Sequence, residues 1–264
     1  MTQDERLNFL IEAFKAESEE YEKLSVPVER DGKRQFLRAL MNVRMPGPMS
    51  AEVLAVQDAY LRERAEEKGV VRLDDIPVIR DGLSVWQGDI TRLAVDAIVN
   101  AANSAMLGCF VPGHNCIDNC IQTYAGVQMR AECDRQMRLM KEKFGRNYVQ
   151  PTSIPMLTDG YNLPAKKVVH IVGPIVTGAL TEKDEKALAD CYTNTLDLCA
   201  REGANSLAFC CISTGVFHFP GKRAAQIAVN TVRGWQETHG NAMERIIFNV
   251  FKDEDKKYYE TLVR

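Results

Sequence analysis

The feature that most constrains this chain is the alternation of short apolar runs with longer amphipathic stretches from residue 76 onward. Such runs, rich in Val, Ile and Phe, are expected of strands buried on both faces of a sheet. They cover residues 83–87, 97–100, 167–172, 206–212 and 245–250. Between them, helices are expected at about residues 115–145, 183–202 and 220–238. This pattern predicts an α/β domain with helices on both faces of the sheet and ligands beyond the carboxyl ends of the strands.

The first 75 residues have a different character, because they contain helical patterns and no strand. Apolar spacing predicts helices over residues 2–23 and 33–43, and Ser50 is placed to cap a third helix that ends before Gly69. No cluster of chemically active side chains occurs here. We therefore expect residues 1–75 to form a helical extension and residues 76–264 to form the main domain. The extension either covers one face of the sheet or docks a partner protein.

Charge and composition narrow the class of protein. The net charge is −3 and neither sign dominates a long block, which argues against nucleic acid as a partner. No stretch reaches the roughly 18 apolar residues that span a bilayer, and the N-terminus does not resemble a signal peptide. We expect a cytoplasmic protein with no membrane partner. There, the eight unevenly spaced cysteines indicate free thiols and a metal site rather than a disulfide framework.

Three junctions between a strand and its following loop carry polar or glycine-containing motifs. Asp89 follows the first strand and suits either a turn cap or a bond to a base amino group. Asn100 ends the second strand and Asn103 follows it, where they suit either a turn or sugar hydroxyls. The segment 213–222 lies between a strand and a helix, where backbone N–H groups can bind an anion. It lacks the spacing of a Walker A loop, and no G-x-G-x-x-G motif follows a strand.

Taken together, these junctions resemble one family. The order Gly-Asp-Ile at 88–90, Val-Asn-Ala-Ala-Asn at 99–103, His-Ile-Val-Gly-Pro at 170–174 and Ser-Thr-Gly-Val-Phe at 213–217 closely resembles the macrodomain family over about residues 80–260. The resemblance implies a three-layer α/β/α fold with a mixed central sheet and a cleft for ADP-ribose.

The resemblance also implies a role for each motif residue. Asp89 would accept a bond from the adenine amino group, with the backbone of Ile90 assisting. Asn103 would face the distal ribose, and Asn100 would support that loop. The pyrophosphate would lie against the loop formed by Ser213, Thr214, Gly215, Val216 and Phe217. Phe251 would line the adenine pocket or, alternatively, would pack in the core.

One departure from the family sharpens the prediction. Many hydrolytic macrodomains carry a glycine run after the asparagine loop, whereas this chain carries Cys109, His114 and Cys116 in a Cys-x4-His-x-Cys pattern. Two thiolates and an imidazole are suitable zinc ligands, and three protein ligands leave one coordination position open. The pattern resembles the zinc-dependent macrodomains, which are often encoded beside a sirtuin-type ADP-ribosyltransferase and a lipoyl-carrier protein. Cys120 could instead close a structural site. Gln122, where many relatives carry histidine, fits the wider family less well.

By this resemblance, the protein would be a hydrolase that removes ADP-ribose from an acidic side chain of a partner protein. Zn²⁺ would polarise a hydroxyl or a bound water, Asp118 would position or activate the attacking group, and Asn103 would hold the ribose. The alternative for Asp118 is a helix cap. His170 is expected in the core and His218 in the wall of the phosphate loop. The alternative functions are a non-catalytic ADP-ribose reader and an O-acetyl-ADP-ribose deacetylase.

Overall fold

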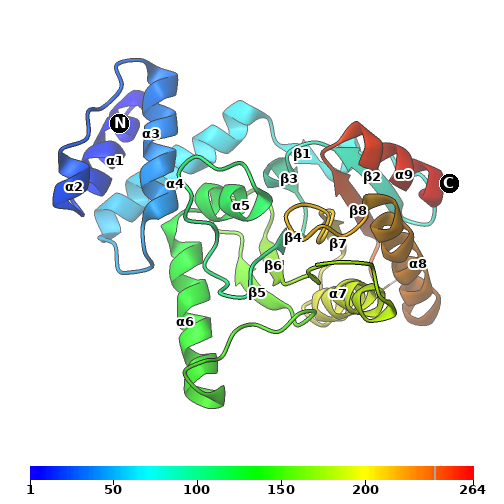
Figure 1. The fold of residues 1–264 in the computed structure, drawn as a ribbon. Helices are drawn as coiled ribbons and strands as arrows, with labels where there is room; N and C mark the ends of the chain where they lie inside the picture. Colours follow the sequence, from blue (N-terminus) through cyan, green and yellow to red (C-terminus); the bar gives the residue numbers. More distant parts are fainter. Residues whose placement is uncertain (241) are drawn as a thin grey trace.

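The computed structural model describes residues 1–240 and 242–264, and its centre is a mixed six-stranded sheet (Figure 1). The strand order is β2-β8-β7-β4-β6-β5. All neighbours are parallel except β5, which is antiparallel to β6. The strands are β2 (Leu83–Gln87), β4 (Ala97–Ala101), β5 (Met156–Asp159), β6 (Lys167–Ile171), β7 (Ser206–Phe209) and β8 (Arg245–Val250). The mixed central sheet expected from the sequence is confirmed.

Helices flank the sheet as layers. On one side lie α5 (Ile117–Ala125) and α6 (Val127–Phe144), and on the other lie α7 (Glu182–Arg201), α8 (Gly221–His239) and α9 (Asp253–Val263) (Figure 1). Parallel strands need right-handed crossovers, so connections that run in opposite directions along the sheet place their helices on opposite faces. Strand β4 is central, and Ile98 and Val99 on its two faces are fully buried. The carboxyl end of β4 is therefore held rigidly in the middle of the domain.

Several boundaries differ from the sequence prediction. The helix expected over 115–145 breaks at Gly126, whose φ of +102° is accessible to glycine at little cost. The strand expected over 206–212 ends at Phe209, because residues 210–212 already turn into the following loop. The antiparallel edge strand β5 and the terminal helix α9 were not predicted. Neither was the short parallel pair of β1 (Val71–Arg72) and β3 (Leu93–Ala94).

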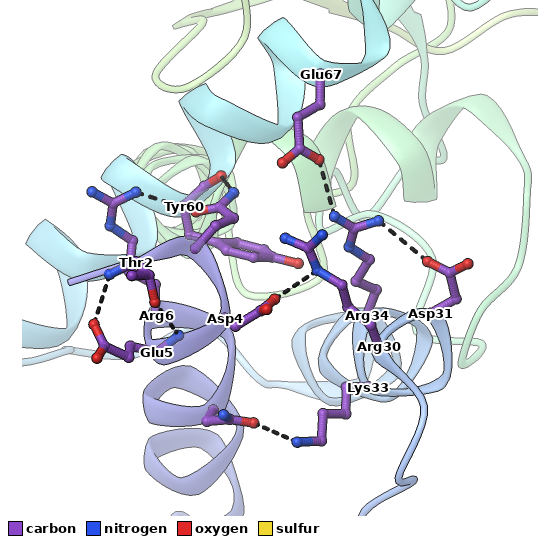
Figure 2. Close-up of polar contacts among 12 residues, drawn as sticks. Thr2, Asp4, Glu5, Arg6, Arg30, Asp31, Lys33, Arg34, Tyr60 and Glu67 are labelled. Carbon is purple, nitrogen blue, oxygen red and sulfur yellow. Dashed lines mark hydrogen bonds and ion pairs between the residues drawn. The ribbon is translucent and has the colours of Figure 1, made fainter.

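The N-terminal segment forms α1 (Gln3–Lys15), α2 (Glu19–Glu22), α3 (Arg30–Val43) and α4 (Ala51–Lys68). The single helix expected over 2–23 is thus two, because Ser18 caps a new helix at Glu19. Leu7, Leu10, Ile11 and Phe14 of α1 are buried in a cluster that is separate from the core of the sheet. Ion pairs such as Arg30–Asp4 and Arg34–Glu67 link α1, α3 and α4 on the outside (Figure 2). The division at residue 75 stays a prediction.

Among the described helices, none combines the length and the apolar character that a membrane crossing would require.

Candidate active site

Two asparagines at the end of β4 converge on the buried carboxylate of Asp118. Asn100 Nδ2 donates to Asp118 Oδ1 at 2.8 Å, and Asn103 Nδ2 lies 3.3 Å from Asp118 Oδ2. Asp118 is only 5% exposed although it belongs to the first turn of α5. Burial raises the pKa of Asp118 to about 6, because it outweighs the bond from Asn100 and the attraction of Arg130. The alternative role as helix cap is not seen, since the Cys116 side chain takes that place.

Asn100 is itself oriented by a histidine behind it. His170 Nδ1 lies 3.1 Å from Asn100 Nδ2, and His170 Nε2 lies 3.0 Å from Thr158 Oγ1. The expected core position of His170 is confirmed, because its side chain has no exposed surface and its ring nitrogens have partners. Burial lowers the pKa of His170 to about 4, so the ring is neutral. A neutral ring that accepts at Nδ1 and donates at Nε2 satisfies both bonds.

Cys109, His114 and Cys116 lie together, as the metal-site prediction requires. Their donor atoms are all within 4.8 Å of one another, and Cys109 Sγ lies 3.4 Å from His114 Nδ1. A tetrahedral zinc with ordinary ligand distances would hold such a sulfur and nitrogen about 3.6 Å apart. The donor set and its spacing therefore fit Zn²⁺. The segment 109–116, here named the metal loop, contains neither helix nor strand.

A fourth protein ligand for a metal at this site was also considered in the sequence, and its candidate was Cys120. Cys120 and Asp118 are not in the group of clustered donors found among the described residues. The Cys120 thiol instead faces Arg38 Nη2 at 3.5 Å. Burial and the adjacent thiol of Cys109 raise the pKa of Cys116 to about 11, although the Asn119 amide acts against this. Metal binding at Cys116 must therefore be coupled to loss of a proton.

The loop 213–219 forms a tight turn ahead of α8. Ser213 has φ +65° and Phe219 N donates back to the Ser213 carbonyl at 3.0 Å. Within residues 1–240 and 242–264, the backbone N–H groups of Gly215, Val216 and Phe217 donate no hydrogen bond. Unpaired N–H groups at a turn before a helix provide an anion site. Val216 is 75% exposed at the tip, and His218, which was expected in the wall of this loop, is also exposed.

The opposite end of the site is formed by β2 and β8. Asp89 accepts bonds from Thr91 N and Oγ1 and so caps the turn that contains buried Ile90. Its second carboxylate oxygen lies 3.7 Å from Lys68 Nζ. Phe251 directly follows β8 and is 78% exposed. The alternative of core packing for Phe251 is therefore wrong.

Comparisons with known proteins agree with this geometry. The family model described as "Macro domain" matches residues 99–228. A "Protein-ADP-ribose hydrolase" of Treponema medium is 48% identical over 100% of both chains, and one of Staphylococcus aureus (strain MRSA252) is 44% identical over 97% of this chain and 94% of its own. The chain belongs to the macrodomain family. A Trypanosoma brucei macrodomain solved in complex with ADP-ribose matches with a TM-score of 0.65 and 28% identity, covering 86% of this chain and 95% of that one.

The macrodomain therefore brings together most of the residues singled out in its sequence. Asn100, Asn103 and Asp118 are joined by hydrogen bonds, and the metal loop ends two residues before Asp118 in the chain. Sequence reasoning missed Asn119, whose Nδ2 donates to the carbonyls of Cys109 and Val111 at 3.1 Å. It also missed Arg38, which reaches the same loop from the N-terminal helices. Asn119 could have been found in the sequence, because it directly follows the candidate residue Asp118. No feature of the sequence pointed to Arg38.

Proposed function

We propose that this macrodomain is a zinc-dependent protein-ADP-ribose hydrolase that removes mono-ADP-ribose from an acidic side chain of a modified protein in the cytoplasm. A lipoyl-carrier protein modified by a sirtuin-type ADP-ribosyltransferase is the first substrate to test. The observation that carries the proposal is the clustering of Cys109, His114 and Cys116 at the start of the helix that carries Asp118. The names of full-length relatives at 44–48% identity support the hydrolase activity.

ADP-ribose would lie across the carboxyl ends of the strands. The free N–H groups of Gly215, Val216 and Phe217 would bind the pyrophosphate, and the buried Ser213 Oγ, which has no partner among the described residues, adds a polar group there. The adenine would lie between Ile90 and the exposed ring of Phe251, with Asp89 accepting from its amino group. Binding energy from these remote groups would fix the distal ribose near Asn103.

The three residues of the metal loop would hold the zinc. Cys109, His114 and Cys116 supply two sulfurs and one nitrogen, and three protein ligands are typical of a catalytic zinc with an open position. When bound there, zinc lowers the pKa of a water or hydroxyl and makes it a better nucleophile near neutral pH.

The role of the protein's own residues follows from their bonds. Asp118 is a carboxylate held from both oxygens, by Asn100 and by Asn103, so that it cannot rotate. In that fixed position it would accept a proton from the attacking group and orient it toward the anomeric carbon. Asn103 lies at the boundary between buried and exposed surface, where its amide would contact the ribose hydroxyls when substrate displaces its bond to the Gly108 carbonyl.

The test is release of free ADP-ribose from a mono-ADP-ribosylated lipoyl-carrier protein, with chelated and zinc-reloaded enzyme measured in parallel. Release only by the zinc form is the expected result. Equal release by both forms would refute the zinc requirement. No release by either form, with ADP-ribose still bound, would identify a reader instead, and cleavage of O-acetyl-ADP-ribose alone would identify the deacetylase.

A further inference from the structure

Arg38 of helix α3, in the N-terminal segment, reaches the metal loop. Arg38 Nη1 donates to Asn115 Oδ1 at 2.7 Å and approaches the Gly113 carbonyl at 3.4 Å. Arg38 Nη2 donates to the His114 carbonyl at 2.5 Å and to Asn119 Oδ1 at 3.1 Å. Both terminal amino groups of this guanidinium are therefore used on the metal loop and on the helix that follows it.

A second residue of α3 holds the same loop. Asn42 is fully buried, its Oδ1 accepts from Gly113 N at 2.8 Å, and its Nδ2 donates to Thr123 Oγ1 of α5. The end of α3 is fixed in turn by Arg130 of α6, whose Nη1 donates to the carbonyls of Met41, Asn42 and Arg44. The helix that presents Arg38 is thus attached to the main domain at α5 and at α6.

The effect of Arg38 extends to two of the three ligand residues, His114 and Cys109. Directly, it fixes the backbone at His114. Through Asn119 it also acts on Cys109, because Asn119 Nδ2 donates to the Cys109 and Val111 carbonyls while its Oδ1 accepts from Arg38. The loop has no helix or strand to hold it, and Gly113 at its tip is exposed with φ +67°. Such a segment keeps one conformation only when other elements supply its bonds.

We propose that the N-terminal helices are part of the metal centre, with Arg38 as the residue that positions the metal loop. This inference rests on the proposed function, since the loop is taken to be the zinc site. Partners that orient metal ligands typically contribute about 10–100-fold to metal affinity or activity. The extension therefore prepares Cys109, His114 and Cys116 for the metal.

The first measurement needs no metal. Amide hydrogen exchange of the metal loop is compared in chelated full-length protein for wild type, Arg38→Gln and Asn115→Ala. The Asn115 change removes one partner of Arg38 from an exposed position and leaves α3 intact. Arg34→Gln is the matched control, because Arg34 lies one turn earlier on α3 and binds Asp31 and Glu67 instead (Figure 2). We expect exchange about 10-fold faster in Arg38→Gln, a smaller increase in Asn115→Ala, and no change in Arg34→Gln.

The second measurement is the zinc dissociation constant, obtained by competition with a chromophoric chelator. It should rise about 10–100-fold in Arg38→Gln and recover in part in Arg38→Lys, with Arg34→Gln unchanged. Wild-type exchange rates and zinc affinity in Arg38→Gln would overturn the proposal. A wild-type protein that binds no zinc would refute the metal in the proposed function, whereas the exchange rates of the same metal-free samples would still decide whether Arg38 holds the loop.

Discussion

Asn100 Nδ2 lies 2.8 Å from Asp118 Oδ1, and this bond ties the end of the central strand β4 to the first turn of helix α5. Both side chains are buried, Asn100 completely. A buried bond to a carboxylate contributes more than a neutral surface bond, and its loss leaves an unpaired acceptor. One oxygen of the candidate acid–base group is therefore held from the core of the sheet.

Replacing Asn100 with Ala should lower the free energy of unfolding by about 1–3 kcal/mol. The reason is that Asp118 Oδ1 and His170 Nδ1, both buried, lose their donor. Denaturant unfolding measures the change. The control is Asn115→Ala, at an exposed position, which should stay within about 0.5 kcal/mol of wild type. A loss in Asn100→Ala no larger than in this control would contradict the assigned role.

Replacing Asp118 with Asn should reduce turnover by about 10²–10⁴-fold, the usual contribution of a positioned acid–base group. The amide has nearly the same shape, so ADP-ribose should still bind, and the change should fall on turnover rather than on affinity. Single-turnover release and calorimetric titration with ADP-ribose separate the two. Turnover close to wild type in a folded, zinc-loaded variant would remove Asp118 from the chemistry.

Replacing Cys109 or Cys116 with Ala should abolish stoichiometric zinc binding and ADP-ribose release together, because two remaining ligands do not retain zinc well. Zinc content measured by elemental analysis, beside the activity of the same samples, tests this. Cys199→Ala is the matched control, since Cys199 is buried on α7 and outside the ligand group. Activity that survives in zinc-free Cys109→Ala protein would refute the catalytic role of the metal.

Gly173→Ala should weaken ADP-ribose binding at least about 10-fold. A Cβ at this position would lie 2.0 Å from Ser213 Oγ and 2.7 Å from Ile212 Cγ2, so the start of the loop 213–219 must move. The binding of the pyrophosphate depends on where this loop is placed. Calorimetry with free ADP-ribose gives the affinity. Gly178→Ala is the control, because nothing lies within 4 Å of its added Cβ. Equal affinity in the two variants would show that the loop is not the pyrophosphate site.

Much of this arrangement was predictable because strands and their terminal motifs are local in sequence. Asp89, Asn100 and Asn103 each follow a run of apolar residues, and parallel strands bring such ends to one edge of a sheet. The ligand spacing of Cys109, His114 and Cys116 is local as well. The break at Gly126 was missed because a helical pattern continues on both sides of it. The reason for a glycine there is tertiary, since Gln57 and Asn162 lie where a side chain would be.

The bonds of Arg38 were not predictable, because they join residues 75 to 82 positions apart in the chain. The sequence of α3 shows only an amphipathic helix, and a surface arginine is the ordinary expectation there. Edge strand β5 escaped prediction for a related reason. It is short, and its pairing with β6 is decided by the fold rather than by its own four residues.

The buried imidazole of His170 should make the protein less stable in acid. Its pKa is about 4 in the folded state against an ordinary value of 6.5, so the unfolded chain binds this proton first. The contribution of His170 to the free energy of unfolding is therefore fully present above pH 6.5. It is lost as the pH drops from 6.5 to about 4, by about 3 kcal/mol in all. Denaturant unfolding at several pH values, for wild type and His170→Gln, isolates the contribution. The wild-type loss over this window should exceed that of the variant, and parallel curves would show that His170 titrates alike in both states.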